Sequence, residues 1–121
     1  MRFLPSLVLA VVMTLAAAAP AFAHAHLAKS EPAKGAVLHT VPTTVILWFT
    51  EKLEPAFSTV EVLDGSGKRV DEGKATVDPA DHTVLRIALK ALPPGTYKAV
   101  WRVVSVDSHS TNGDFTFKVA P

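Results

Sequence analysis

Apolar and polar residues alternate in several short runs of this chain, and the longest of these runs covers residues 96–106. Alternation with a period of two places successive side chains on opposite faces of a β-strand. No run with helical periodicity is long enough to predict a helix. We therefore predict a strand at residues 96–106, with Tyr97, Ala99, Trp101, Val103 and Ser105 on one face, and further strands at residues 45–49, 57–63, 83–89 and 115–119.

Turn signals separate these runs. Residues 64–67 read Asp-Gly-Ser-Gly, residues 92–95 read Leu-Pro-Pro-Gly, and residues 107–113 form a polar loop that ends in a turn-favouring Asn112-Gly113. Glycine favours tight connections because it accepts positive φ angles. Short strands joined in this way predict an all-β fold, an immunoglobulin-like Greek-key β-sandwich or barrel of about seven strands. The aromatic residues predicted to lie in its core are Trp48, Trp101, Phe115 and Phe117.

The first 23 residues have the pattern of a cleavable signal peptide. Arg2 precedes an apolar run over residues 3–19, and Ala21-Phe22-Ala23 has the small-x-small form that precedes a cleavage point. We expect cleavage after Ala23, which leaves one mature domain of residues 24–121. Its longest uncharged stretch is interrupted by proline and threonine and is shorter than the roughly 20 apolar residues of a spanning helix. The mature chain is therefore predicted to be exported to the periplasm without inserting in the membrane.

Composition excludes several classes of function for the mature chain. The 121 residues include 12 Lys and Arg, 11 Asp and Glu, five His, two Met and no Cys. Loss of residues 1–23 would remove Arg2 and both Met, leaving 11 basic and 11 acidic side chains and all five His. A neutral chain without clustered Lys or Arg is not expected to bind nucleic acid. Without Cys or Met, the mature chain can form no disulfide, thiolate nucleophile or soft sulfur site.

Cleavage after Ala23 would expose a metal chelate at the new N-terminus. His24 would then offer two nitrogens from one residue, its free α-amine and its imidazole Nδ1. Asp107 and His109 lie two residues apart at the end of the longest predicted strand, so in extended backbone their side chains share a face. Amine, imidazole and carboxylate ligands suit tetragonal Cu(II), which the Irving–Williams order favours over the competing Zn²⁺. The α-amine must lose a proton to bind, so we expect the affinity to rise with pH across the neutral range.

Other arrangements remain open at this stage. An Asp-x-His pair in a loop is by itself more often a turn-capping Asp beside a solvated His. His26 permits a rival mode, in which the α-amine, two deprotonated backbone amides and its own imidazole surround Cu(II) in a plane. That mode needs a flexible terminus, whereas Leu27 and the residues after it look able to join a sheet, so the folded site is favoured. Glu51 is a candidate partner for a metal-bound His from outside the ligand set, and His39 and His82 are expected to be solvated surface residues.

Several segments of the mature chain match one known family. They are His24-Ala25-His26-Leu27, Ser30-Glu31-Pro32-Ala33, Phe49-Thr50-Glu51, residues 92–97, residues 97–109 and residues 113–117. With these segments the chain resembles the CopC family of periplasmic copper-binding, copper-resistance proteins over nearly its whole mature length. The resemblance implies an immunoglobulin-like fold that binds one Cu(II) per chain through the amine and imidazole of His24, the Asp107 carboxylate and His109, with Glu51 close by. It also implies copper buffering, resistance or delivery, beside a CopD-like inner-membrane copper protein.

Two features depart from the family pattern. Ser108 stands where the family usually has Gly between the Asp and the His, so a backbone angle open to Gly is less accessible and we expect the loop geometry to be affected. Residues 63–74, which match a Met-rich Cu(I) site in some members, contain neither Met nor His. We therefore expect a site for Cu(II) alone, without copper transfer between two sites of one molecule.

The sequence thus predicts a monomeric, non-catalytic copper-binding protein. No Gly-rich phosphate loop, Ser-His-Asp arrangement or paired acid–base carboxylates are evident. The alternative is a small copper oxidase of the histidine-brace type, since lytic polysaccharide monooxygenases also hold copper with an N-terminal His on a β-sandwich. Asp107 as a direct ligand would fill space that oxygen needs, and the short chain leaves little room for a glycan-binding face. A third reading is an immunoglobulin-like adhesion or chaperone module that binds no metal.

Overall fold

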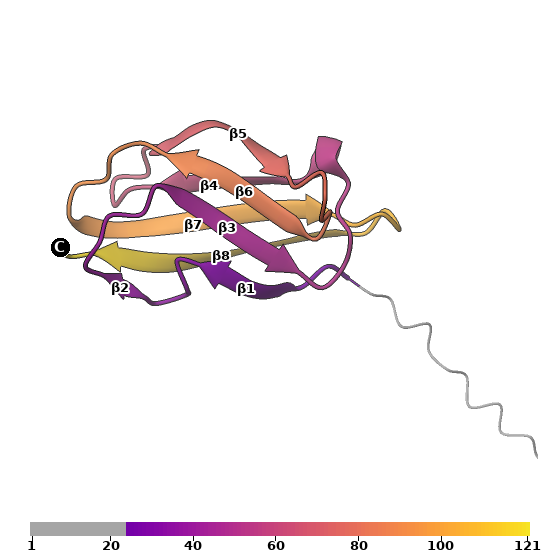
Figure 1. The fold of residues 1–121 in the computed structure, drawn as a ribbon, viewed down its shortest axis with the longest axis horizontal. Coiled ribbons are helices and arrows are strands. Elements are labelled where there is room, and N and C mark those ends of the chain that lie inside the picture. The colour runs from indigo at the N-terminus through magenta and orange to yellow at the C-terminus, as the bar shows by residue number, and fades with distance from the viewer. Residues whose placement is uncertain (1–23) are drawn as a thin grey trace, which may run out of the picture.

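The computed structural model describes residues 24–121, which fold into two β-sheets packed face to face (Figure 1). The predicted signal peptide, residues 1–23, lies outside the described residues. In order across the first sheet lie β1 (Leu27–Glu31), β3 (Thr44–Phe49), β6 (Val84–Leu89) and β5 (Asp71–Val77). In order across the second lie β2 (Val37–Leu38), β8 (Ser110–Val119), β7 (Gly95–Val104) and β4 (Thr59–Leu63), while a 3-10 turn, η1 (Pro55–Phe57), precedes β4.

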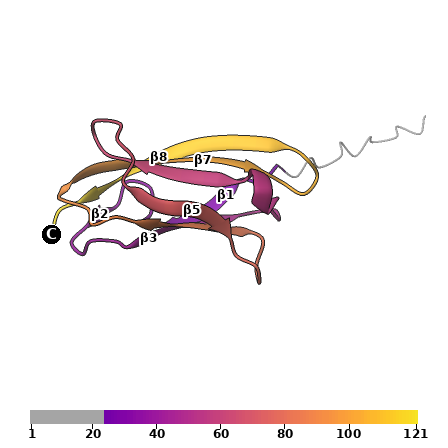
Figure 2. The same cartoon turned by 90° about the horizontal axis from the view of Figure 1, so that it is seen from above.

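The predicted all-β sandwich is confirmed, and Figure 2 shows its two sheets as separate layers. Neighbouring strands are antiparallel except for β2, which runs parallel to β8. Among the described strands, only the β5–β6 and β7–β8 connections stay within one sheet. Such crossing between sheets is the Greek-key arrangement of immunoglobulin-like domains. The two-residue β2 is too short to leave an alternating pattern, and with it the described chain has one strand more than the predicted number.

The core lies between the sheets, and β7 contributes the face that the alternating pattern predicts. Its residues from Tyr97 to Val103 are alternately buried and less buried, and Ser105 continues the buried face with 1% exposure. The opposite sheet contributes the inward residues of β3 and β6. The buried apolar residues of this core include Val45, Leu47, Phe49, Val60, Val62, Leu85, Ile87, Leu89, Tyr97, Ala99, Trp101, Val103, Phe115, Phe117 and Val119.

The prediction that Trp48 lies in the core is wrong. Val45, Leu47 and Phe49 occupy the inward face of β3, so strand alternation places Trp48 on the outer face, where it is only half-buried. The ammonium of Lys29 lies 4.3 Å from the centroid of the Trp48 ring. A cation above the ring face is a stabilising contact for an indole that the core does not enclose.

The Asn112-Gly113 turn is also wrong, because both residues lie inside β8 opposite Arg102 and Trp101. A Cβ atom at Gly113 would lie 2.5 Å from Cζ2 of Trp101, closer than real contacts allow. The glycine therefore marks the close approach of an indole ring and not a turn. The β7–β8 connection is made by the residues before Ser110, and the polar loop is shorter than predicted.

The strand predicted from Phe57 begins two residues later, at Thr59. The segment before it is the 3-10 turn η1, which starts at a proline and leaves Phe57 66% exposed.

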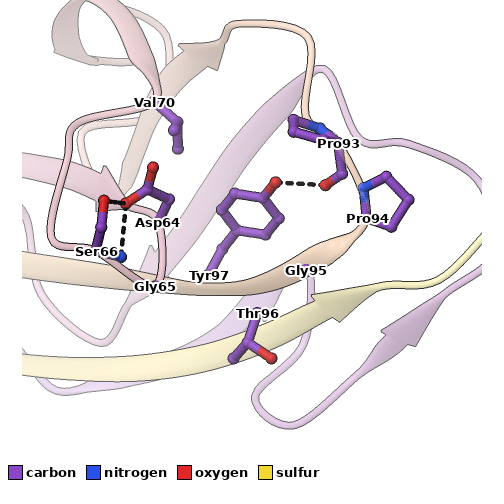
Figure 3. A pocket seen from close by; sticks show the side chains of 9 residues that line it. All are labelled: Asp64, Gly65, Ser66, Val70, Pro93, Pro94, Gly95, Thr96 and Tyr97. Carbon is purple, nitrogen blue, oxygen red and sulfur yellow. Dashed lines mark hydrogen bonds between the residues drawn. The ribbon is translucent and has the colours of Figure 1, made fainter.

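At the other end of the sandwich, the hydroxyl of Tyr97 donates a hydrogen bond to the carbonyl of Pro93, four residues upstream (Figure 3). This bond has the form of the tyrosine corner that closes Greek-key sandwiches. Within residues 24–121, no helix is long and apolar enough to cross a bilayer.

Candidate metal centre

His24 and the loop between β7 and β8 meet at one end of the sandwich. The imidazole rings of His24 and His109 lie edge to face, with centroids 5.0 Å apart and planes at 85°. Nδ1 of His24 is buried and has no hydrogen-bond partner among the described residues. A buried polar atom without a partner loses the hydration that it has in water, and such atoms are rare in folded proteins. A cation bound at Nδ1 would supply the missing interaction.

Asp107 and His109 form a pair beside this histidine. Nδ1 of His109 lies 3.2 Å from Oδ2 of Asp107, and the backbone N–H of His109 donates to Oδ1 of the same carboxylate at 3.4 Å. The hydroxyl of Ser105 donates a further hydrogen bond to Oδ1. The Ser105 bond, followed by the contacts with His109, lowers the pKa of Asp107 against the opposing effect of burial. Asp107 is therefore a carboxylate at neutral pH, as a metal ligand must be.

The connecting residue Ser108 adopts the left-handed conformation, with φ of 71°. Its N–H donates to the carbonyl of Ser105 at 2.9 Å, and the carbonyl of His109 accepts from the N–H of Ser105 at 2.9 Å. The loop thus closes through the backbone angle that a glycine would adopt easily, although serine is less suited to it. We expected Ser108 to affect the loop geometry, but in the structure residue 108 still adopts the positive φ angle that glycine favours.

The structure brings His24 next to His109, and His109 next to Asp107. Over residues 24–121, however, no three His, Cys, Asp or Glu side chains are grouped closely enough to hold a metal ion. The predicted set includes one further donor, the α-amine that cleavage before His24 would create. The described residues therefore provide two neighbouring pairs, His24 with His109 and His109 with Asp107.

The structure places the other predicted residues at different parts of the sandwich. The His26 side chain is exposed, and its ring centroid is 6.3 Å from that of His24. Glu51 is half-buried and makes no hydrogen bond or ion pair with any described residue. His82 is exposed on the β5–β6 connection, and its carbonyl accepts from the N–H of Leu53 at 2.9 Å. His39 lies at the opposite end of the sandwich, exposed, with Nδ1 2.9 Å from the carbonyl of Ala120.

Three hydroxyl residues hold this end together and were not predicted. Ser105 bonds to Asp107, Thr50 bonds to the backbone of residues 24 and 26, and Thr111 donates to the carbonyl of Ala25 at 2.8 Å. Ser105 carries a detectable signal, because it is a polar residue on the face of the β7 pattern that is otherwise apolar. The two threonines carry none, since their partners are 24 to 86 residues away in the sequence.

The opposite end has a hollow of about 350 Å³ between residues 64–70 and 93–97 (Figure 3). Its polar groups bind one another. The hydroxyl of Tyr97 donates to Pro93, and Asp64 accepts from the hydroxyl of Ser66 at 2.7 Å. No buried side-chain polar atom of the described chain lacks a partner there, so the hollow offers no unpartnered ligand atom such as Nδ1 of His24.

The profile of the CopC domain matches residues 27–120 of this chain. The chain belongs to the CopC family. The matched segment contains Asp107 and His109 and begins three residues after His24. The predicted resemblance to CopC proteins is therefore confirmed, and with it the assignment to a family of copper resistance and copper transport proteins.

Individual CopC relatives support the same assignment. Copper resistance protein C of Xanthomonas campestris pv. juglandis is 35% identical over 122 residues, which cover 94% of this chain and 95% of that protein. The copper transport protein CutJ of Bacillus subtilis is 34% identical over 99 residues, which cover 81% of this chain but only 18% of CutJ. The crystal structure of CopC from Methylosinus trichosporium OB3b superposes with a TM-score of 0.76 at 31% identity, covering 81% of this chain and 95% of that one.

Proposed function

We propose that this protein is an exported copper carrier that holds one Cu(II) ion where His24, Asp107 and His109 meet. The observation that carries the proposal is the buried Nδ1 of His24, which has no hydrogen-bond partner among the described residues and lies against the ring of His109. An imidazole nitrogen that is kept out of water and has no hydrogen-bond partner is available to bind a metal ion. The relatives named for copper resistance and copper transport support copper as that cation.

The proposed ligand set requires cleavage after Ala23. The α-amine of His24 then joins Nδ1 of the same residue in one chelate ring, and Asp107 and His109 supply a carboxylate and a second imidazole. These nitrogen and oxygen donors suit Cu(II), and residues 24–121 offer no sulfur for Cu(I). Glu51, half-buried next to Thr50, is proposed to support the site from outside the ligand set.

The proposed role is buffering, resistance or delivery of copper in the periplasm without catalysis. A monomer with one ion per chain is sufficient for this role. The chain matches only 18% of CutJ. Since the resemblance to CopC proteins implies a CopD-like partner, we propose that this protein acts beside a separate membrane copper protein of the CopD type.

The experiment uses protein expressed as the full chain, exported and purified from the periplasm, with its first residue read from its intact mass. Titration with Cu(II) alone, followed by electron paramagnetic resonance, is expected to give one tetragonal, nitrogen-rich species that saturates at one copper per chain. His24→Ala should abolish this species, and Lys34→Ala, an exposed residue outside the site, should leave it unchanged.

Four results would contradict the proposal. A first residue other than His24 removes the proposed amine, and the absence of tight copper binding removes the site. Production of peroxide from ascorbate well above that of free copper, or copper-dependent oxidation of a polysaccharide, would instead favour the histidine-brace oxidase. Absence of metal binding with His24 disordered would favour an adhesion or chaperone module.

A further inference from the structure

The backbone of residues 24–26 is held by hydrogen bonds from both sheets. On the side of the first sheet, the N–H of His26 donates to Oγ1 of Thr50 at 2.9 Å, and the N–H of Thr50 donates back to the carbonyl of His26 at 2.9 Å. The hydroxyl of Thr50 also donates to the carbonyl of His24 at 3.3 Å. Thr50 follows the last residue of β3 directly, so these bonds tie the segment to the end of that strand.

On the side of the second sheet, Thr111 in β8 donates its hydroxyl to the carbonyl of Ala25 at 2.8 Å. The side chain of Ala25 is completely buried in the core between the two sheets. The bonds from Thr50 and Thr111, together with the buried Ala25, are called the N-terminal clamp below. The clamp fixes the segment on which His24 is presented to His109.

The clamp bears directly on how a His-Ala-His terminus binds copper. In the planar mode, the metal takes the α-amine, the deprotonated amide nitrogens of Ala25 and His26, and the imidazole of His26. The amide N–H of His26 is already donated to Thr50, and closing the backbone around a metal would draw Ala25 out of the core. The folded mode uses none of these amide nitrogens, because His24 contributes only its amine and its ring.

We propose that the hydroxyls of Thr50 and Thr111 are positioning groups that select the folded copper mode, because they hold the backbone of residues 24–26 in place and keep the amide of His26 bonded to Thr50 instead of to the metal. This inference rests on the proposed function, since it concerns the coordination of copper at the same site. It goes beyond that function because it assigns the choice between two coordination modes to two side chains that are not ligands.

The test compares Thr50→Val and Thr111→Val with Thr50→Ser and Thr111→Ser in the exported, processed protein. Valine keeps the shape of threonine but has no hydroxyl, whereas serine keeps the hydroxyl. With one equivalent of Cu(II), the wild type and both serine variants are expected to give the same single resonance spectrum. The valine variants are expected to lose about 10- to 100-fold in affinity for the folded mode, as groups that support metal ligands do, and to gain a second spectrum with four nitrogen ligands in a plane.

A further variant identifies the origin of the second spectrum. If it arises from the planar mode, adding His26→Ala to Thr50→Val or Thr111→Val should remove it, because the imidazole that completes the plane is gone. The same His26→Ala change alone should leave the wild-type spectrum unaltered. Thermal unfolding of every variant, followed by circular dichroism, shows whether the sandwich remains folded.

A measurement without copper tests the clamp itself. Amide hydrogen exchange at His26 in the metal-free protein is expected to be at least about tenfold faster in Thr50→Val than in the wild type, with the serine variant close to wild type. Folded valine variants that keep the wild-type spectrum, affinity and exchange rate would overturn the clamp and leave the proposed function intact. A wild-type protein that binds no copper, or binds it in the planar mode, would overturn the proposed function and with it the selection of mode.

Discussion

The two ends of the sandwich hold their polar side chains in different ways. In the hollow lined by Tyr97 and Asp64, the side-chain hydrogen bonds of these two residues join residues two to four positions apart, and no buried side-chain polar atom of the described chain lacks a partner there. At the end around His24, the backbone of residues 24–26 is held by the side chains of Thr50 and Thr111, which lie 24 to 86 residues away in the sequence, and Nδ1 of His24 has no partner among the described residues.

This difference distinguishes hydrogen bonds that stabilise the fold from those that position a candidate ligand. Short-range bonds such as Tyr97 to Pro93 close turns, and the polar groups that form them already have their partners within the chain. Long-range bonds such as Thr111 to Ala25 fix a segment whose own side chain, His24, is left with an unused nitrogen. Unsatisfied buried groups persist when a ligand supplies their partner. We therefore call the His24 end, where the proposed site lies, the binding end, and the Tyr97 end the structural end.

The largest effect is expected from His109→Ala and from Asp107→Ala. Each removes a proposed ligand, and since loss of groups behind the ligands already costs about 10- to 100-fold in metal affinity, we expect Cu(II) affinity to fall by more than about 100-fold. Competition with a copper chelator of known affinity measures the change. Both side chains are at least partly exposed, so unfolding by urea should change little. Affinities within tenfold of wild type would show that the binding end has been assigned incorrectly.

The matched change at the structural end is Tyr97→Phe. It removes the hydroxyl that bonds to Pro93 and keeps the packing of the ring against Phe117, whose centroid is 5.7 Å away. A hydrogen bond of this kind contributes about 1 kcal/mol, so the free energy of unfolding should fall by about that amount while copper affinity stays the same. Urea denaturation and the chelator competition give the two values. A loss of copper affinity without a loss of stability would reverse the contrast between the ends.

A smaller effect is expected from backbone angles at both ends. Ser108 at the binding end has φ of 71° and Gly67 at the structural end has φ of 82°. Ser108→Gly should raise the free energy of unfolding by up to about 1 kcal/mol, and Gly67→Ala should lower it by about 1 kcal/mol, because only glycine adopts these angles at low cost. Thermal and urea unfolding measure both. Destabilisation by Ser108→Gly would mean that the serine side chain stabilises the loop.

The smallest effect is the acid dependence of stability. Hydrogen bonds from the Ser66 hydroxyl, from the Ala80 N–H and from the Thr83 hydroxyl are the largest causes that lower the pKa values of Asp64, Asp78 and Asp81 respectively. A carboxylate whose pKa is lower in the folded state stabilises the fold above its unfolded pKa of about 3.9, and this stabilisation is lost as the pH falls through the folded pKa.

These carboxylates lie in turns at the surface, so the loss below about pH 4 should be shallow. Urea unfolding between pH 3 and pH 6 should show stability that decreases only at the acid end, with a weaker decrease in Asp64→Asn. Stability that increases on acidification over this range would contradict these pKa directions.

Strand patterns predicted most of the fold because β7 alternates strictly, and its inward face from Tyr97 to Ser105 is buried as expected. One failure arose where a residue depends on a partner on the neighbouring strand, and the other where alternation within a strand decides which side chain faces inward. Gly113 has the local signature of a turn, but it sits under the ring of Trp101 in the middle of a ladder. Trp48 has a core composition, but alternation within β3 gives the inward face to its neighbours.

The site was predictable to the same extent. Residue chemistry and spacing identified His24, Asp107 and His109, and the structure brings them together as two neighbouring pairs. Thr50 and Thr111 could not be predicted, because their hydrogen-bond partners lie 24 and 86 residues away in the sequence and only folding brings them together. The ligand assignment itself stays a prediction until copper is bound to the processed chain.

The most direct measurement adds one alanine between Ala23 and His24 while keeping cleavage before the added residue. The ring of His24 and the Asp107–His109 pair remain, but the α-amine moves one residue away and can no longer share a chelate ring with Nδ1. The account predicts that Cu(II) affinity falls by more than about 100-fold and that the wild-type resonance spectrum disappears. Retention of tight binding with an unchanged spectrum would contradict it.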